Sequence, residues 1–291
     1  MFMRNCIDNY EPSHNCTIDE QLVSFRGRCS FRIYMKNKPD KYGLKILMLN
    51  DSEHFYMVSA IPYVGKVTPQ NNDSVPTYFV RKLVEMASIT ETWRTLTMDN
   101  WFTSVPLFEK LKKERQLRAV GTIRKNKKEI PSTLKIATAV DSSRFVFTPD
   151  LTLVSYVPKK KQEVFLLSSV YHNTNINATT NKPQIIMDYN ACKGATDTFD
   201  EKCHIYSVAR RTKRWPLKFF YNMLNQASIN SCVLYNLQAD NPILSRSKFI
   251  KNLAMSLVEP HLRRRLEMQR LRHHIRKIIS KLLRVDVPAV Q

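Results

Sequence analysis

Four aspartates lie in contexts that suit metal-assisted chemistry. Asp19 lies in the run CTIDEQL and Asp99 in LTMDNWFTS, and each follows a short apolar stretch typical of a β-strand. Asp197 and Asp200 lie in KGATDTFDEKC, three residues apart, which puts both carboxylates on one face of a helix. Carboxylates from three separate segments can hold two hard divalent cations such as Mg²⁺. A metal pair of that kind assists phosphoryl transfer.

Each aspartate taken alone has a simpler interpretation. The chain contains 25 acidic residues, and an Asp at the end of a strand is more often a turn or cap residue than a metal ligand. The metal interpretation therefore depends on the elements that surround each carboxylate.

The elements that carry Asp19 and Asp99 follow a recognisable order. Residues 14–25 predict a first strand, and apolar runs at 41–50 and 55–63 predict two more. Next come a helix at 77–88, a short strand that ends at Asp99, a helix from about Ser104 and a strand at 118–124. This is the order of a ribonuclease-H-like α/β fold, in which the first and fourth strands are neighbours in the sheet. The fold would bring Asp19 and Asp99 together.

The rest of the chain predicts an insertion and a helical end. A basic loop, strand-like runs at 145–147, 151–157 and 163–170, and a polar loop at 173–182 predict a β-rich insertion over 125–183. From Pro183 the core resumes with a strand, PQIIMDY, and a helix that carries Asp197 and Asp200. Three further helices are predicted at 216–237, 245–258 and 261–283.

These elements predict a definite domain organisation. The catalytic core comprises 14–124 and 184–206, and the insertion at 125–183 separates its two parts. A short N-terminal flank covers 1–13, a helical segment covers 207–285, and a tail covers 286–291. The last predicted helix carries an apolar stripe among Arg and Lys, so it could dock on the fold, bind a partner or lie on a membrane surface. Docking is the default for such a stripe.

Composition narrows the class of protein. The formal charge is +21, and residues 206–291 alone carry 17 basic and 4 acidic residues. Clustered positive charge of this size favours binding to nucleic acid over a merely solubilising face or attraction to anionic lipid. No apolar run approaches the length of a membrane span, and the first residues lack a signal-peptide core. The 6 cysteines have no CxxC spacing and are interpreted as reduced thiols of an intracellular protein, so no zinc site is expected.

Long ordered blocks of the sequence resemble the piggyBac transposase family. TIDEQLVSFRGRCSFRIYMKNKPDKYGLKILMLND resembles the family's first catalytic block, and LTMDNWFTSVPLFEKL with GTIRKNKKEIP resembles the second. KPQIIMDYNACKGATDTFDEKCHIYSVARRTKRWPLKFFYNMLNQASIN resembles the third, and LTLVSYVPKK matches the insertion. The resemblance extends from about residue 10 to 285.

The resemblance implies a DDD transposase, a transposable-element enzyme of DNA recombination. Such an enzyme cleaves a DNA strand and joins the 3′ end to TTAA target DNA. The family's catalytic acids correspond to Asp19, Asp99 and Asp197, and an adjacent family aspartate corresponds to Asp200. These four would be the catalytic and metal-binding residues of a site for two Mg²⁺ or Mn²⁺ ions. The partners would be TTAA target DNA and transposon ends.

The DNA-facing candidates follow from charge and position. Arg210, Arg211, Lys213 and Arg214 come shortly after the third acidic block and could contact backbone phosphate. Trp215 is more often a packing residue at such a place. Trp101 could contact target DNA or lie buried beneath the site. Lys125, Lys127 and Lys128 could form a DNA-contacting loop or an ordinary solvated charge run.

Two departures from the family pattern leave the present activity open. The chain begins just before the first catalytic strand, and it ends without the family's C-terminal cysteine-rich zinc module. It would then be truncated at both ends, and 207–285 would be half of a dimerisation and DNA-binding domain. One interpretation is a transposase core in the nucleus, acting as a homodimer. The others are a catalytically silent DNA-binding remnant and an adaptor that forms a mixed dimer with a full-length transposase.

Overall fold

The computed structural model describes residues 1–65, 67–69, 73–135 and 139–286. The chain divides into two compact units, Met1–Val233 and Leu234–Gln291. They are called the first and the second unit below, and each is described by itself.

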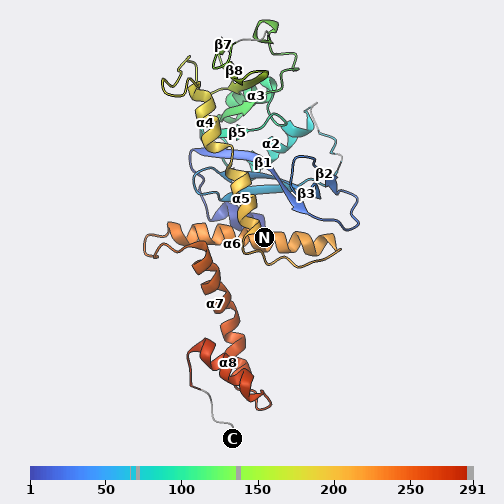
Figure 1. The fold of residues 1–291 in the computed structure, drawn as a ribbon, viewed down its shortest axis with the longest axis vertical. Helices are drawn as coiled ribbons and strands as arrows, with labels where there is room; N and C mark the ends of the chain where they lie inside the picture. The colour runs from blue at the N-terminus through green and yellow to red at the C-terminus, as the bar shows by residue number, and fades with distance from the viewer. Residues whose placement is uncertain (66, 70–72, 136–138, 287–291) are drawn as a thin grey trace. The chain divides into compact units, whose positions relative to one another are not determined.

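Within the described residues, the first unit is built on one mixed sheet of nine strands (Figure 1). Their order is β2-β3-β1-β5-β6-β9-β8-β7, and β4 pairs with the outer side of β3. The strands are β1 (Asn15–Ser24), β2 (Ile33–Tyr34), β3 (Tyr42–Asp51), β4 (Met57–Pro62), β5 (Thr95–Met98), β6 (Arg118–Thr122), β7 (Ser143–Phe147), β8 (Thr152–Lys159) and β9 (Gln162–Ser168).

The centre of this sheet confirms the predicted neighbourhood of the two acidic strands. β1 runs antiparallel to β3 and parallel to β5, and the parallel register ends with Ile18 opposite Met98. Parallel strands joined through a helix are usually buried on both faces and read as apolar runs. β5 follows that rule, because all four of its residues are buried.

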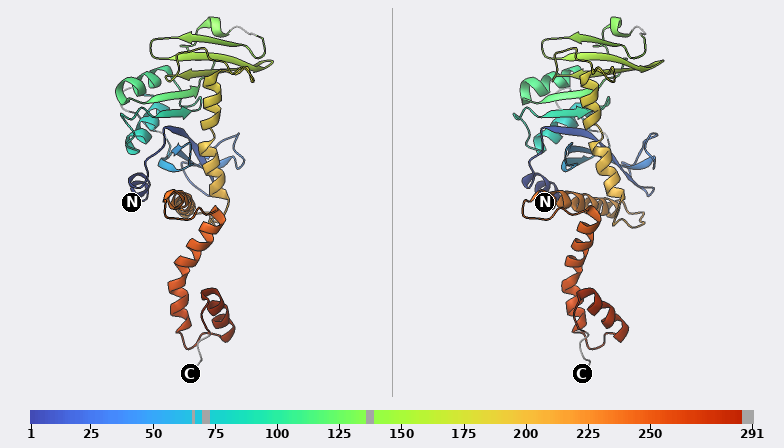
Figure 2. Two further views of the ribbon diagram at one scale, coloured as in Figure 1. Left: turned by 90° about the vertical axis from the view of Figure 1, so that its left-hand side faces the viewer. Right: turned by 60° about the vertical axis from the view of Figure 1, so that its left-hand side comes forward.

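Helices cover both faces of the sheet (Figure 2). On one face lie α2 (Val75–Met86), which contacts β3 and β4, and α3 (Val105–Arg115), which contacts β6. Ser74 and Ser104 cap these two helices, since each hydroxyl accepts a backbone N–H of the first turn. On the other face lie α4 (Gln184–Cys192) and α5 (Ala195–His204), which contact β1. The short helix α1 (Phe2–Asp8), which the sequence did not predict, contacts β4.

The strands of the segment 125–183 extend the core sheet. β9 pairs antiparallel with β6, β8 pairs with β9, and β7 pairs with β8. The part of the sheet that carries β1 and β5 therefore continues without a break into these strands. The turn Ser132–Lys135 precedes them as a 3₁₀ helix.

The strand predicted at 183–189 is wrong, because the segment forms α4. Ile185 and Ile186 are buried against Val120, Val154 and other residues of β6, β8 and β9. Tyr189 joins the same cluster one turn later. A short apolar run can be a buried strand or a buried helix, and periodicity over so few residues does not separate the two. The helical spacing of Ile185 and Tyr189 is what puts both on the cluster.

α6 (Trp215–Leu237) packs on the core of the first unit through polar side chains. Asn230 accepts the N–H of Met57 at 3.0 Å and donates to the carbonyl of the same residue at 2.8 Å. Gln226, one turn earlier, and Asn222, two turns earlier, bond to Gln21 of β1. All three are buried, so these hydrogen bonds replace the water that their amides would otherwise keep.

The second unit is helical, with helix ends that differ from the prediction. α7 (Arg246–Leu266) runs through Pro260, and α8 (His273–Leu283) starts after a turn, so 261–283 is not one helix. The break lies where the buried guanidinium of Arg276 donates to the carbonyls of Leu266 (2.5 Å) and Met268 (2.9 Å). Leu266 is the last residue of α7, so its carbonyl lacks a helical partner and Arg276 supplies a donor, whereas the carbonyl of Met268 also accepts the N–H of Leu271 at 3.2 Å. Among the described residues, no helix has the length and apolar character needed to cross a membrane.

Candidate active site

Asp19 and Asp99 come from neighbouring strands at the centre of the sheet. Asp19 lies in β1 directly after Ile18, and Asp99 follows the last residue of β5. Because Ile18 faces Met98 in a parallel register, these two aspartates are the next pair along the strands. The Oδ1 atom of Asp99 accepts the N–H of Trp101 at 2.9 Å, and Oδ1 of Asp19 accepts the N–H of Glu20 at 2.7 Å.

The surroundings of Asp19 disfavour the charged form of its carboxyl group. Burial is the largest cause that raises the pKa of the Asp19 carboxyl, and the carboxylates of Glu20 and Asp99 raise it further. The backbone N–H of Glu20 and the ammonium of Lys38 act in the opposite direction but leave the pKa well above its ordinary value. A partly buried carboxylate beside other carboxylates keeps its charge most readily when a cation is near.

The other two acids lie on α5, which crosses the face of the sheet beside β1. Asp197 is in the first turn of this helix, where the partial positive charge of the N-terminus favours a carboxylate. Its side chain is 66% exposed, and Lys38 Nζ lies 3.2 Å from its Oδ1. Lys38 also donates to the carbonyl of Glu20 at 3.2 Å. This lysine therefore links the third acidic segment to the strand that carries Asp19.

Asp200 lies one turn further along α5 and is less exposed. Its Oδ1 accepts a hydrogen bond from Gln21 Nε2 at 2.8 Å and lies 3.6 Å from His204 Nε2. The hydrogen bond with Asp200 is the main cause that raises the pKa of His204. Asp197, Asp200 and Lys38 line one side of an open hollow of about 410 Å³ next to α5.

The four aspartates thus form two pairs: Asp19 with Asp99 on neighbouring strands, and Asp197 with Asp200 on α5. Over the described residues, no three Asp, Glu, His or Cys side chains already converge tightly enough to hold a metal ion. Lys38 extends toward Asp19 and bonds Asp197, and a positive charge there offsets part of the repulsion among these carboxylates. The oxygen-only donors, and an Asp19 whose charge needs a cation, fit a hard divalent ion such as Mg²⁺ or Mn²⁺. Coordination by all four aspartates stays a prediction.

The predicted DNA-facing segment is accessible. Arg210, Arg211, Lys213 and Arg214 are all exposed. The backbone of this segment passes so close to the loop after β1 that a Cβ on Gly27 would lie 2.5 Å from the carbonyl oxygen of Lys213. The close approach needs a residue without a side chain at position 27.

Trp215 follows this segment, and Trp101 follows Asp99. Trp215 packs edge-on against Phe31, with ring centroids 5.0 Å apart, yet it is 39% exposed. Trp101 is half-buried, and Lys45 Nζ lies 4.0 Å from the centroid of its ring. A lysine over an indole at this distance is a cation–π contact. Trp101 therefore has an intramolecular partner and is not a freely presented aromatic ring.

The lysines of the loop after β6 differ from one another. Lys125 forms an ion pair with Glu163 of β9 at 2.7 Å. Lys127 is half-buried, whereas Lys128 is exposed. The neighbouring Arg124 is exposed and donates to Asn100, the residue after Asp99, at 3.0 Å. Lys125 would have to leave its partner to contact DNA.

Sequence reasoning missed Lys38, Lys45 and Gln21. Gln21 had a detectable signal, because it lies two residues after Asp19 in a predicted strand and therefore on the same face. The two lysines had none, since the contact of Lys38 with Asp197 depends on the path of the chain between β2 and β3, and that of Lys45 with Trp101 depends on the packing around β3.

Comparison with known proteins adds to this geometry. The family profile described as "Transposase IS4" matches residues 1–232. A solved structure, the cryo-EM structure of a piggyBac transposase synaptic complex with hairpin DNA, is 44% identical in sequence to this chain and has a TM-score of 0.93. The match covers 99% of this chain and 61% of that one, so this chain spans less than two thirds of the length of that protein. The likeness confirms the predicted ribonuclease-H-like α/β core with its sheet and covering helices.

Proposed function

The chain belongs to the piggyBac family of transposases, and from that premise we propose that it is a catalytic core for metal-dependent cleavage and transfer of DNA strands. The observation that carries the proposal is the position of Asp19 beside Asp99 on adjacent parallel strands, with α5 bringing Asp197 and Asp200 to the same strand. Members of the DDE transposase class generally use divalent metals, which suits this set of oxygen donors.

In the proposed mechanism, the acids act as ligands. Asp19 and Asp99 would hold the cations from the centre of the sheet, and Asp197 and Asp200 would hold them from α5. When bound, a metal pair would activate the attacking oxygen of a phosphodiester exchange and offset charge on the departing one. Lys38 and a cation would compete for the Asp197 carboxylate, because the ammonium already contacts one of its oxygens. The carboxylates need not act as general bases.

The proposed substrate is DNA, with TTAA as the target and transposon ends as the donor. The similar solved structure is, by its title, a synaptic complex with hairpin DNA. In this chain the net charge of +21 and the exposed Arg210, Arg211, Lys213 and Arg214 suit contacts with phosphate. The same proposal includes assembly as a homodimer or as a mixed dimer with a full-length transposase. It also includes residence in the nucleus.

The test of the metal site compares the parent with Asp99→Asn. The parent should cleave TTAA-containing DNA in the presence of Mn²⁺, and the variant should lose cleavage while its DNA affinity stays nearly unchanged. Asn keeps an oxygen for the N–H of Trp101, so the loop after β5 should persist. Equal cleavage by the two proteins would disprove the assignment.

The DNA surface is tested with Arg211→Ala combined with Arg214→Ala. Each phosphate contact adds close to one unit to the slope of log affinity against log salt, so the pair should flatten that slope by about two. Lys160→Ala with Lys161→Ala, exposed in the turn between β8 and β9, serves as a charge-matched comparison. An unchanged slope for the arginine pair would place the DNA surface elsewhere.

A DNA-binding protein without catalysis is the second candidate function. The ion pair between Lys38 and Asp197 favours it, because a lysine already occupies an oxygen that a cation would need. Calorimetry separates the two candidates. Saturable Mn²⁺ binding by the parent, lost in an Asp99→Asn, Asp197→Asn double variant, supports the enzyme. A folded parent that binds DNA but no Mn²⁺ supports the silent form.

A further inference from the structure

Gln21 is a buried polar residue in the strand that carries Asp19. It lies two residues after Asp19 in β1 and is 1% exposed. A glutamine side chain offers one carbonyl oxygen and one NH₂ group, and burial makes each of them costly to leave unpaired. Gln21 therefore needs partners from the elements packed on this face of the sheet.

Its partners come from two different helices. Gln21 Nε2 donates to Asp200 Oδ1 of α5 at 2.8 Å. Gln21 Oε1 accepts from Asn222 Nδ2 and from Gln226 Nε2 of α6, each at 2.9 Å. An ionised carboxylate can only accept, so the NH₂ group of Gln21 must face Asp200, and its oxygen must face α6. The chemistry allows one orientation of the Gln21 amide.

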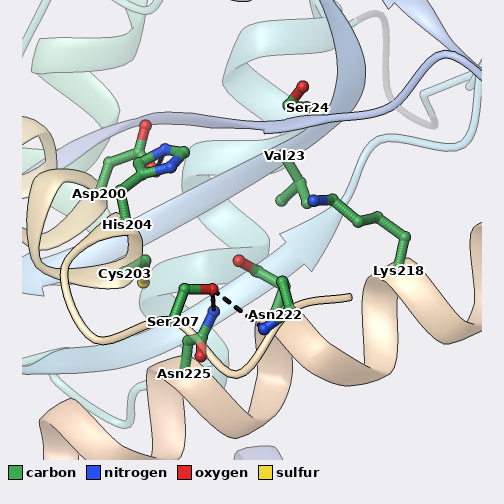
Figure 3. A pocket seen from close by; sticks show the side chains of 10 residues that line it. Val23, Ser24, Asp200, Cys203, His204, Ser207, Lys218, Asn222 and Asn225 are labelled. Atoms are coloured by element: carbon green, nitrogen blue, oxygen red, sulfur yellow. Dashed lines mark hydrogen bonds and ion pairs between the residues drawn. The ribbon is translucent and has the colours of Figure 1, made fainter. Parts of the chain in front are cut away.

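The α6 side of this arrangement is equally well defined. Asn222 and Gln226 are four residues apart and share a face of the helix, and both are buried. Asn225, on the same side, donates to Ser207 Oγ at 2.9 Å and accepts the N–H of Val208 at 3.0 Å. Figure 3 shows Asn222 and Asn225 on α6 below the turn of α5 that carries Asp200 and His204.

We propose that Gln21 is a positioning residue for the acidic site, acting through Asp200. Gln21 and His204 engage Asp200 Oδ1 from two sides, and α6 holds Gln21 in the orientation that this requires. Residues that hold a metal-binding carboxylate in place tune metal affinity without touching the metal. α6 thereby contributes to the geometry of a site to which it supplies no acid. The inference rests on the proposed metal-binding function.

A purely structural role for Gln21 gives a different expectation. If Gln21 served only to satisfy buried amides of α6, its loss would lower stability and leave the metal affinity of the folded protein unchanged. If it acts through Asp200, its loss should weaken metal binding only while Asp200 is present. A double-mutant cycle separates these cases, because two residues that act through one another have non-additive effects.

The experiment is calorimetric titration of Mn²⁺ into the parent, Gln21→Met, Asp200→Asn and the double variant. Methionine has the length of glutamine, carries no charge and makes none of the three hydrogen bonds. Gln21→Met should weaken Mn²⁺ binding about tenfold, the lower end of the range for such supporting residues. In the Asp200→Asn background the same change should cause no further loss. Thermal unfolding of each variant shows that it is folded during the titration.

Gln184→Met is the matched control. Gln184 also donates its amide to an aspartate, Asp188, at 2.8 Å, but it lies at the start of α4 and contacts none of the four acids. Its replacement should leave Mn²⁺ affinity unchanged. Unchanged affinity in folded Gln21→Met, or an equal loss with and without Asp200, would overturn the positioning role alone. Absence of Mn²⁺ binding in the parent would overturn the metal-binding function and this inference together.

A charge-conserving exchange covers the case in which Gln21→Met does not fold. Gln21→Glu combined with Asp200→Asn keeps the net charge and reverses the direction of the hydrogen bond, and the carboxylate introduced into β1 can still accept from Asn222 and Gln226. This variant should fold and should bind Mn²⁺ as weakly as Asp200→Asn. Affinity equal to that of the parent would show that the site does not need the carboxylate of Asp200, and the proposal would be wrong.

Discussion

Asp19→Asn should stabilise the metal-free protein at neutral pH. The carboxylate of Asp19 is partly buried beside Glu20 and Asp99, and these surroundings raise its pKa. The asparagine keeps an oxygen that can accept the N–H of Glu20, and it removes the charge. Stability lost to function is common at catalytic sites, and here the causes are burial of the charge and, next, repulsion from the neighbouring carboxylates, both of which a cation would relieve.

The expected gain is about 1–2 kcal/mol. Two like charges about 5–6 Å apart repel each other by on the order of 3 kcal/mol at an effective dielectric constant near 20. Lys38 offsets part of that cost through its attraction to Asp19. For a domain of about 150–250 residues, 1 kcal/mol corresponds to roughly 2–4 °C in Tm. The gain should therefore be measurable by calorimetry or circular dichroism.

The gain should depend on pH in a defined direction. The pKa of Asp19 is higher in the folded protein than in the unfolded chain, so the folded state binds this proton more tightly. Stability of the parent then falls as pH rises above the unfolded value of about 3.9, and the advantage of asparagine grows over the same range. Below about pH 4, where the carboxyl is protonated in both states, the parent and the variant should be equally stable.

The assay is thermal unfolding of the parent and Asp19→Asn with EDTA and then with Mn²⁺. Excess Mn²⁺ at 100 times its Kd would stabilise only the parent, by about 2.7 kcal/mol, and so reverse the order of the two Tm values. Asp240→Asn, at an exposed position of the second unit, makes the same change in net charge away from the acids. Equal or lower stability of Asp19→Asn in EDTA at pH 7 would refute the reasoning.

Two further predictions concern supports of the fold. Burial alone would raise the pKa of the Asp51 carboxyl, but hydrogen bonds from the N–H of Ser13 and other donors lower it below its ordinary value. The stability that Asp51 contributes is therefore present when pH is above the ordinary pKa of an aspartate, and it is lost as pH falls through the lowered pKa. Asp51→Asn should cost about 2–3 kcal/mol in urea unfolding at pH 7 and much less near pH 3, and equal costs at both pH values would contradict this. Arg276→Met should speed amide hydrogen exchange in α8 and the end of α7, since the carbonyls of Leu266 and Met268 lose the guanidinium that joins them to α8. Unchanged exchange there would show that the guanidinium does not hold the α7–α8 turn.

The local elements of the core could be predicted from the sequence because their signals lie among near neighbours. The strand around Asp19 and the serine-capped helix after Asp99 depend on residues within a few positions of each other. Their order along the chain was enough to predict that the strands of Asp19 and Asp99 are adjacent, and the parallel register of β1 and β5 agrees.

Errors arose where a local signal was ambiguous. The run at 183–189 has the composition of a strand, and only the cluster formed by β6, β8 and β9 selects the helix α4. The last helices were divided at Pro260, a usual helix breaker, but α7 continues through it. The chain turns instead after Leu266, where Arg276 supplies the donors.

The amino-acid sequence by itself determined which carboxylates could do chemistry, the order of the elements that carry them, and the basic character of the segment at 210–214. Only the tertiary structure decided that Lys38 bonds Asp197, that Lys125 is paired with Glu163, and that Gln21 joins Asp200 to α6. Hydrogen bonds such as Gln21 to Gln226 join residues 205 positions apart. They form because helices α5 and α6 pack on β1, and no periodicity along the chain encodes which polar groups that packing brings into contact.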